Sequence, residues 1–73
     1  MPVYCLFDRS GAEQTIFNVA AADPDDARRL VALNCQVAAQ DKEIYGCELD
    51  ASVSVPWGEI HAVDGRVIKV VRV

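Results

Sequence analysis

One helix start, between two stretches of strand-like sequence, limits the folds that this chain can adopt. Asp23 is suited to accept hydrogen bonds from the first free N–H groups of a helix, and Pro24 fits the first helical position, where no N–H is needed. Asp25 and Asp26 follow in the first turn, where the positive end of the helix dipole favours carboxylates. We therefore interpret these acidic residues as a helix cap and not as metal ligands.

The residues after the cap have the periodicity of one helical face, and they predict a helix over residues 24–39. Asn34 falls near the centre of the apolar face. Either it is buried and bonded to a backbone group, or the helix ends early with Asn34 in the left-handed cap position. The apolar face comprises Ala27, Leu30, Val31, Cys35 and Ala38.

Strand patterns lie on both sides of this helix. Residues 3–8 and 14–21 are rich in β-branched and aromatic residues and flank a Ser-Gly turn, which predicts an N-terminal hairpin. Residues 43–55 alternate between apolar and polar positions, with a bend expected at Gly46. Residues 59–63 and 66–73 flank an Asp-Gly turn, which predicts a second hairpin whose last strand is an edge strand.

The element order β-β-α-β-β-β predicts a single α+β domain over residues 1–73. We expect an antiparallel sheet of about five strands with one helix packed on one face. The other face is expected to be largely exposed and to carry Ile44, Glu48 and Asp50.

Composition restricts the function classes. The 73 residues suffice for one domain, and 52% hydrophobic with 25% charged residues is typical of a globular chain. A net charge of −4 argues against strong unaided binding of nucleic acid and is compatible with a basic protein partner. The sequence has neither an apolar run of membrane-spanning length nor a signal peptide, so we expect a cytoplasmic protein.

The sequence predicts no metal site, no cofactor and no catalytic residue. Cys5, Cys35 and Cys47 have no paired spacing, and His61 is the only histidine, so a structural zinc site is not expected. Each cysteine falls on an apolar stripe, which favours buried, reduced thiols that pack as small hydrophobic side chains.

Two catalytic alternatives remain open at the level of sequence. Pro2 resembles the N-terminal proline that small tautomerases use as a general base, although a strand pattern follows here where that family has a long helix. His61 shares a strand face with Glu59 and could act with one of the cysteines as a base–nucleophile pair.

The candidate binding residues are aromatic or basic. Tyr4 points opposite to Val3, Cys5 and Phe7, and it is an interface anchor if its side faces outward. Two adjacent arginines are expected on the outer side of the helix, free for a partner or paired with Asp25 or Asp26. Trp57 lies in a loop as either a lid on the core or an interface hot spot. The predicted partner-binding residues are Tyr4, Arg28, Arg29, Trp57, Arg66 and Lys69.

The order of elements around residues 21–30 (AADPDDARRL) resembles that of small phage-encoded anti-CRISPR proteins, one-helix antiparallel-sheet inhibitors of type I CRISPR surveillance complexes. The resemblance implies that Tyr4, Arg28 and Arg29 contact the backbone subunits of such a complex. Arg66 and Lys69 lie in the region where that family has basic residues with a DNA-related role. It therefore implies a non-enzymatic inhibitor that masks a nucleic-acid-binding surface, in the cytoplasm of the bacterial host.

A second class of function is a small interaction module. Such a protein would self-associate as a homodimer through an exposed sheet face or through the edge formed by residues 66–73. A third class is a Pro2-dependent, tautomerase-like enzyme.

Overall fold

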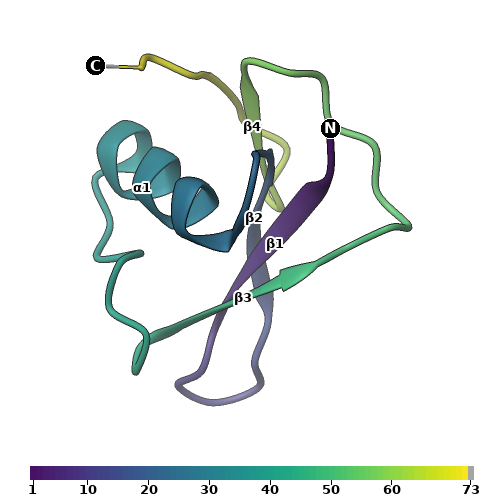
Figure 1. Cartoon of the computed structure of the whole chain (residues 1–73). Helices are drawn as coiled ribbons and strands as arrows, with labels where there is room; N and C mark the ends of the chain where they lie inside the picture. Colours follow the sequence, from purple (N-terminus) through teal and green to yellow (C-terminus); the bar gives the residue numbers. More distant parts are fainter. Residues whose placement is uncertain (73) are drawn as a thin grey trace.

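The computed structural model describes residues 1–72, which form five strands and one helix in the predicted order (Figure 1). The α+β class, the single helix and the five-stranded antiparallel sheet are therefore confirmed. The elements are β1 (Val3–Asp8), β2 (Thr15–Ala20), α1 (Pro24–Cys35), β3 (Tyr45–Leu49), β4 (Glu59–Ala62) and β5 (Val67–Lys69).

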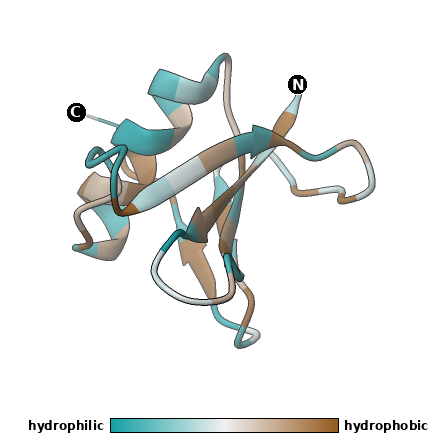
Figure 2. Cartoon of the chain, turned by 90° about the horizontal axis from the view of Figure 1, so that it is seen from below, coloured by the Kyte–Doolittle hydropathy of each residue, from teal (hydrophilic) through white to brown (hydrophobic). Residues whose placement is uncertain are grey.

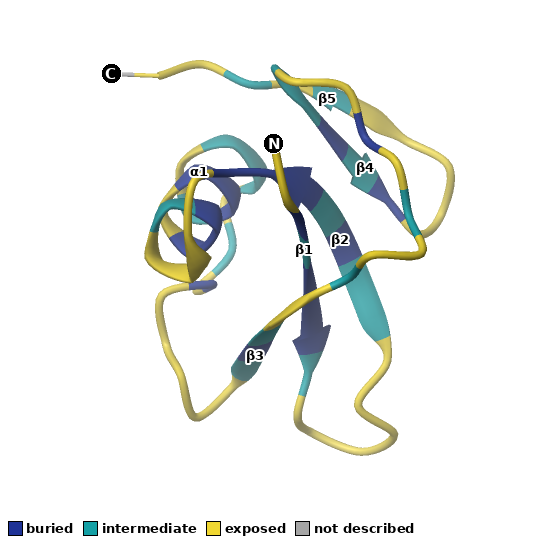
Figure 3. Ribbon diagram, turned by 45° about the vertical axis from the view of Figure 1, so that its right-hand side comes forward, coloured by how far each residue is buried: buried dark blue, intermediate teal, exposed yellow. Residues whose placement is uncertain are grey.

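The strand order in the sheet is β3-β1-β2-β4-β5, and every neighbouring pair is antiparallel. The two hairpins predicted from the sequence are β1–β2 and β4–β5, and they lie side by side through the β2–β4 ladder. Helix α1 packs against one face of this sheet, and Figure 3 shows its buried side turned towards the strands. This topology leaves β3 and β5 as the two edges.

The core lies between α1 and the sheet. Leu6 of β1 pairs with Phe17 of β2, and both side chains are buried against Leu30 and Val31 of the helix. Ile60 of β4 completes this layer. Each such side chain contributes about 1.5–3 kcal/mol when it is removed from water, so this layer is the main source of stability.

The helix begins as the sequence predicts. Asp23 Oδ1 accepts a hydrogen bond of 2.7 Å from Asp26 N, and Pro24 occupies the first turn. Asp26 Oδ2 in turn accepts a bond of 3.2 Å from Ala22 N, so two otherwise free backbone donors are satisfied at this end. The capping interpretation of the acidic residues is therefore confirmed for Asp23 and Asp26.

The helix ends earlier than residue 39, so the predicted extension is wrong. The last helical residue is Cys35, and Gln36 adopts the left-handed conformation with φ 54° and ψ 43°. The early-stop alternative placed this conformation at Asn34, two residues too soon. The chain then turns back, so that Ala39 is fully buried against the core.

Arg28 explains this reversal, and its predicted position on the outer helix surface is wrong. Its side chain is only 7% exposed, and Nη1 donates a hydrogen bond of 2.9 Å to the carbonyl oxygen of Ala39. A buried guanidinium needs such an acceptor, because an unpaired buried charge is strongly unfavourable. Arg28 thus fixes the segment after the helix to its first turns.

The sheet face away from α1 is less open than expected. Val3, Cys5, Phe7 and Ala20 alternate with the helix-facing residues, yet all four are buried. Val53 and Val55, in the loop between β3 and β4, pack against Val3 and Ala20. Ile44 and Glu48 are exposed as expected, whereas Asp50 is half-buried.

Strands β2 and β4 are one or two residues shorter than predicted, and β3 and β5 are shorter by five residues or more. The strand expected over residues 43–55 is limited to Tyr45–Leu49, because Asp50 begins a turn in which its carboxylate accepts hydrogen bonds from the amide and hydroxyl of Ser52. The strand expected over residues 66–73 is limited to Val67–Lys69. Val73 lies outside the described residues.

Candidate functional site

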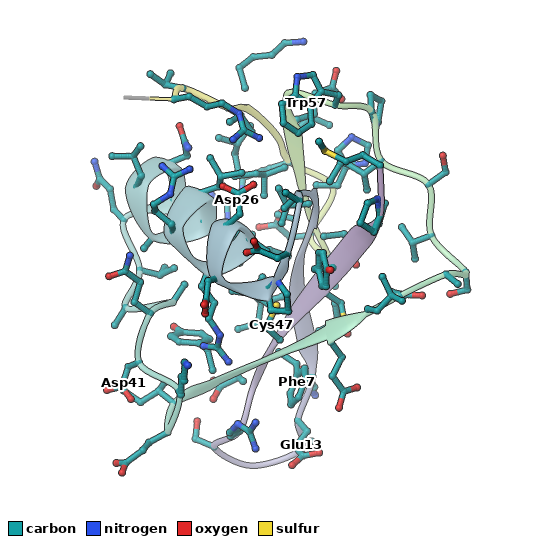
Figure 4. The ribbon with its side chains drawn as sticks, in the orientation of Figure 1. Phe7, Glu13, Asp26, Asp41, Cys47 and Trp57 are labelled. Carbon is teal, nitrogen blue, oxygen red and sulfur yellow. The ribbon has the colours of Figure 1, made fainter. Side chains whose placement is uncertain are left out.

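An exposed tryptophan and three charged residues form one surface at the end of the sheet where β4 begins. The guanidinium of Arg72 lies over the Trp57 ring, 4.0 Å from its centroid. Trp57 is 54% exposed, so its ring is available to a partner although one face is covered. In Figure 4, Trp57 lies at the top of the molecule above Asp26 of α1. We call Asp26, Arg29, Trp57 and Arg72 the Trp–Arg patch.

Asp26 connects the helix to the rest of this patch. Its Oδ1 atom accepts a hydrogen bond of 2.7 Å from Arg29 Nη2 and lies 3.5 Å from Arg72 Nη1. Burial opposes ionisation of Asp26, but the bond from Ala22 N and the two guanidinium groups outweigh it and lower the pKa of this carboxyl. The patch therefore holds two arginines around one carboxylate and has a net positive charge.

The chain end that bears Arg72 is held by Asn34. Asn34 Oδ1 accepts a hydrogen bond of 2.8 Å from Val71 N, and Asn34 Nδ2 donates to Val71 O at 3.2 Å and to Leu30 O at 2.9 Å. The prediction that a backbone group satisfies Asn34 is confirmed, and the side chain is half-buried. By binding both backbone groups of Val71, the amide fixes the residue next to Arg72.

The predicted binding residues do not form one surface. Arg29 and Trp57 belong to the Trp–Arg patch, and the predicted ion pair between Arg29 and Asp26 is confirmed. Tyr4 lies on the helix side of the sheet and packs against the core, so the outward position that would make it an anchor is not observed. Arg28 is buried, as described above. Arg72 was missed because no local pattern relates residue 72 to residue 57.

The two remaining basic residues pair with neighbours on the second hairpin. Arg66 Nε donates to Asp64 Oδ2 at 2.8 Å, and Lys69 Nζ donates to Glu59 Oε2 at 3.2 Å. Arg66 and Asp64 also line a small pocket of about 260 Å³ between the two hairpins. The hydrogen bonds of Arg66 and Lys69 therefore do not connect them to the Trp–Arg patch.

Pro2 lies at the surface of the molecule, directly before β1. Pro2 lines an open groove of about 500 Å³ together with Met1, Leu49, Ala51 and Val53, and this lining is mostly apolar. Asp50 is the one acidic residue of that lining.

His61 is held by Glu59, with Nε2 and Oε1 2.9 Å apart, as the shared face predicted. Cys5 lies in the same cross-strand row, but Asn18 of β2 stands between them. Two strand spacings amount to about 10 Å, which is too far for a direct bond between a nucleophile and its base.

The thiols have the environment of structural cysteines. All three are free. Burial raises the pKa of Cys5, Cys35 and Cys47, so their reactive thiolate forms are depleted at neutral pH. Figure 4 shows Cys47 on β3 facing the start of α1, where its Sγ atom lies 3.9 Å from the carbonyl oxygen of Pro24.

Within residues 1–72, no group of three or more His, Cys, Asp or Glu side chains is arranged to hold a metal ion. The same residues contain no helix that is long and apolar enough to cross a membrane. In comparisons with known proteins, no family model, no curated protein and no solved structure matches this chain.

Proposed function

We propose that this chain is a non-enzymatic binding protein that inhibits a nucleic-acid-handling complex by covering one of its surfaces. The observation that supports this function is the stack of Arg72 on the exposed ring of Trp57. Tryptophan and arginine are the residue types that most often dominate the energetics of protein interfaces. Trp57 is also the one aromatic residue among the large hydrophobic side chains that are exposed.

The Trp–Arg patch is organised before a partner arrives. The carbonyl oxygen of Gly58, directly after Trp57, accepts a hydrogen bond of 2.9 Å from Val70 N, which ties this loop to the segment that leads to Arg72. Arg72 restricts the ring from one side, and Asp26 restricts both arginines. A side chain that is already ordered loses less rotamer entropy on binding, so such a patch binds more tightly than its area suggests.

The charge of the patch indicates the chemistry of the partner. Arg29 is 45% exposed and retains donors that are suited to a carboxylate or phosphate group. The whole chain has a net charge of −4, which opposes binding to nucleic acid alone. A protein subunit that presents an acidic residue beside an apolar pocket fits both observations.

A type I CRISPR surveillance complex is the first partner to test. The order of elements supports this choice, and Arg29 is the one implied contact residue that remains exposed. Tyr4 and Arg28 are used inside the fold. We therefore place the proposed contact on Arg29, Trp57 and Arg72, and we propose a phage-encoded inhibitor that acts in the host cytoplasm.

The experiment measures binding of the purified protein to a panel of purified type I surveillance complexes, together with target-DNA binding by each complex. Trp57→Ala should weaken binding about 30-fold or more, the range of an interface hot spot. Arg9→Glu is the matched control for Arg29→Glu, because Arg9 is an exposed arginine in the turn after β1, at the opposite end of the sheet.

Arg29→Glu should abolish inhibition of DNA binding, whereas Arg9→Glu should leave it intact. If all complexes bind their DNA normally in the presence of the protein, the proposed partner is wrong. If a complex is inhibited equally by the wild type and by Trp57→Ala, the assignment of the binding surface is wrong.

A further inference from the structure

The two edges of the sheet differ in how they are protected. Edge β5 is three residues long and includes Lys69, and the backbone of Val71 just beyond it is bonded to Asn34. Short length and a lysine are common protections against pairing with another strand. Edge β3 is five residues long (YGCEL) and has neither lysine nor proline. In Figure 2, β3 runs across the front of the molecule, with no other strand drawn along its outer side.

The hydrogen-bond pattern shows which backbone groups of β3 point outward. Asp50 N donates to Val3 O at 2.9 Å, and this bond sets the alternation of the β1–β3 ladder. In an antiparallel pair, every second residue bonds to the partner strand. Glu48 therefore bonds to β1, whereas the N–H and C=O groups of Cys47 and Leu49 point away from it.

The segment that forms β3 and its flanks is acidic, whereas the nearby arginines come from other elements: Arg28 is buried, and Arg9 N is bonded to Ile44 O. Leu49 is 63% exposed, so an apolar side chain accompanies the outward-pointing backbone groups. Lys42 is the only basic residue over positions 41–50, and it lies 3.9 Å from Asp25. Figure 4 shows Asp41 in the segment that leads into β3. The carboxylates over the same positions are Asp41, Glu43, Glu48 and Asp50.

A groove continues from this edge. The apolar groove of about 500 Å³ described above is lined by Leu49, the last residue of β3, together with Ala51, Met1 and Pro2. An apolar side chain from a strand laid along β3 can enter this groove at the end of the edge. The site thus offers outward backbone groups and negative charge along β3, and Leu49 at its end borders an apolar recess.

We infer that the β3 edge binds an extended, lysine- or arginine-rich segment of a partner protein as a sixth strand. In this mode of recognition, backbone hydrogen bonds provide affinity, and alternate side chains provide specificity. The charge favours a cationic segment over a second copy of this chain, because two β3 edges would bring the same carboxylates together. The site does not include the Trp–Arg patch, so this inference stands or falls independently of the proposed function.

The probe is a capped heptapeptide of alternating lysine and valine, titrated into the isotope-labelled protein at low ionic strength. We expect the amide signals of Cys47 and Leu49 to shift, and their exchange with solvent to slow about tenfold or more. A glutamate–valine peptide of the same length should have no effect. Equal shifts with both peptides, or shifts confined to β5, would overturn the inference.

Pairing of the β3 edge with a second copy of this chain is tested in the absence of peptide. If raising the protein concentration alone slows exchange at the Cys47 and Leu49 amides, the edge pairs with another copy and the cationic segment is the wrong occupant. If exchange is independent of concentration and the lysine–valine peptide slows it, the inference is supported.

Leu49→Pro removes an outward donor without breaking the β1–β3 ladder, and proline is tolerated at such edge positions. It should weaken peptide binding about tenfold, whereas the control Leu49→Ala should stay within about threefold of the wild type. Equal binding by both variants would contradict strand addition. Should Leu49→Pro not fold, Glu48→Lys tests the charge instead: binding of the lysine–valine peptide should fall about fivefold, and an unchanged affinity refutes the proposal.

Discussion

Replacing Gly46 by alanine tests how the Phe7 ring is held on the sheet face away from α1. Phe7 and Gly46 are direct cross-strand partners, and the ring is 8% exposed. A Cβ atom added to Gly46 would lie closer than 3 Å to three carbon atoms of that ring. The Phe7 ring therefore occupies the space that a side chain at position 46 would need, and only glycine fits there.

The Gly46→Ala substitution should lower the free energy of unfolding by a similar amount whether the Phe7 ring stays in place or swings out. If the ring stays, the overpacked face costs about 1–3 kcal/mol. If the ring swings out, about 1.5–3 kcal/mol of apolar burial is lost, together with the stacking of Arg9, whose guanidinium lies 5.5 Å from the ring centroid. A chain of this length has a total stability of about 4–11 kcal/mol, so a loss of about 2–3 kcal/mol is large. The melting temperature should fall by about 10–20 °C.

Urea unfolding followed by circular dichroism measures this loss, and a double-mutant cycle with Phe7→Ala assigns its cause. In the Phe7→Ala background the clash is absent, and alanine is favoured over glycine in a strand by about 0.5–1 kcal/mol. Gly46→Ala should therefore destabilise the wild type and slightly stabilise Phe7→Ala. An equal cost in both backgrounds, or a wild-type cost below about 0.5 kcal/mol, would refute the explanation.

Three further predictions concern polar contacts inside the fold. Arg28→Ala should lower the free energy of unfolding by about 2–3 kcal/mol in urea titrations, because the buried carbonyl of Ala39 loses its donor. Asn34→Ala should cost about 1–2 kcal/mol and accelerate amide exchange at Val71. Because folding lowers the pKa of Asp26, its ionised carboxylate stabilises the folded state at neutral pH. This stabilisation is lost as the pH falls from about 4 through the folded-state pKa. Asp26→Asn should therefore melt below the wild type at pH 7, and the difference between their melting temperatures should shrink as the pH falls below about 4.

The parts of the fold that follow local rules could be predicted from the sequence. The Asp23–Pro24 cap and the Asp64–Gly65 turn each depend on residues within one turn of the chain. The path of the chain after α1 involves instead a bond from Arg28 to a carbonyl eleven residues later, which no periodicity reveals. The end of β3 had a local signal, since Asp50 and Ser52 have the spacing of an Asx turn.

The candidate site was predictable only in part, because contacts between residues far apart in the sequence bring it together. Trp57 and Arg29 are the residue types expected at an interface, and both are exposed. Their convergence with Arg72 depends on Asn34, which fixes the chain end beside α1. The side of the sheet on which Tyr4 lies was undecided by alternation alone, because both faces of β1 are apolar.

The uneven distribution of charge allows the two proposed surfaces to be separated by salt. The β3 edge combines four carboxylates with one lysine, so binding there depends on attraction between exposed charges and weakens as salt shortens the screening distance to about 8 Å. The Trp–Arg patch combines arginines, whose attraction to a partner is also screened by salt, with a half-exposed ring whose apolar burial is less sensitive to moderate salt. If both proposals hold, raising the salt concentration releases the cationic segment from β3 first, while the partner at Trp57 stays bound. Release of the partner at Trp57 at a lower salt concentration than the cationic segment would contradict this distribution of charge between the two surfaces.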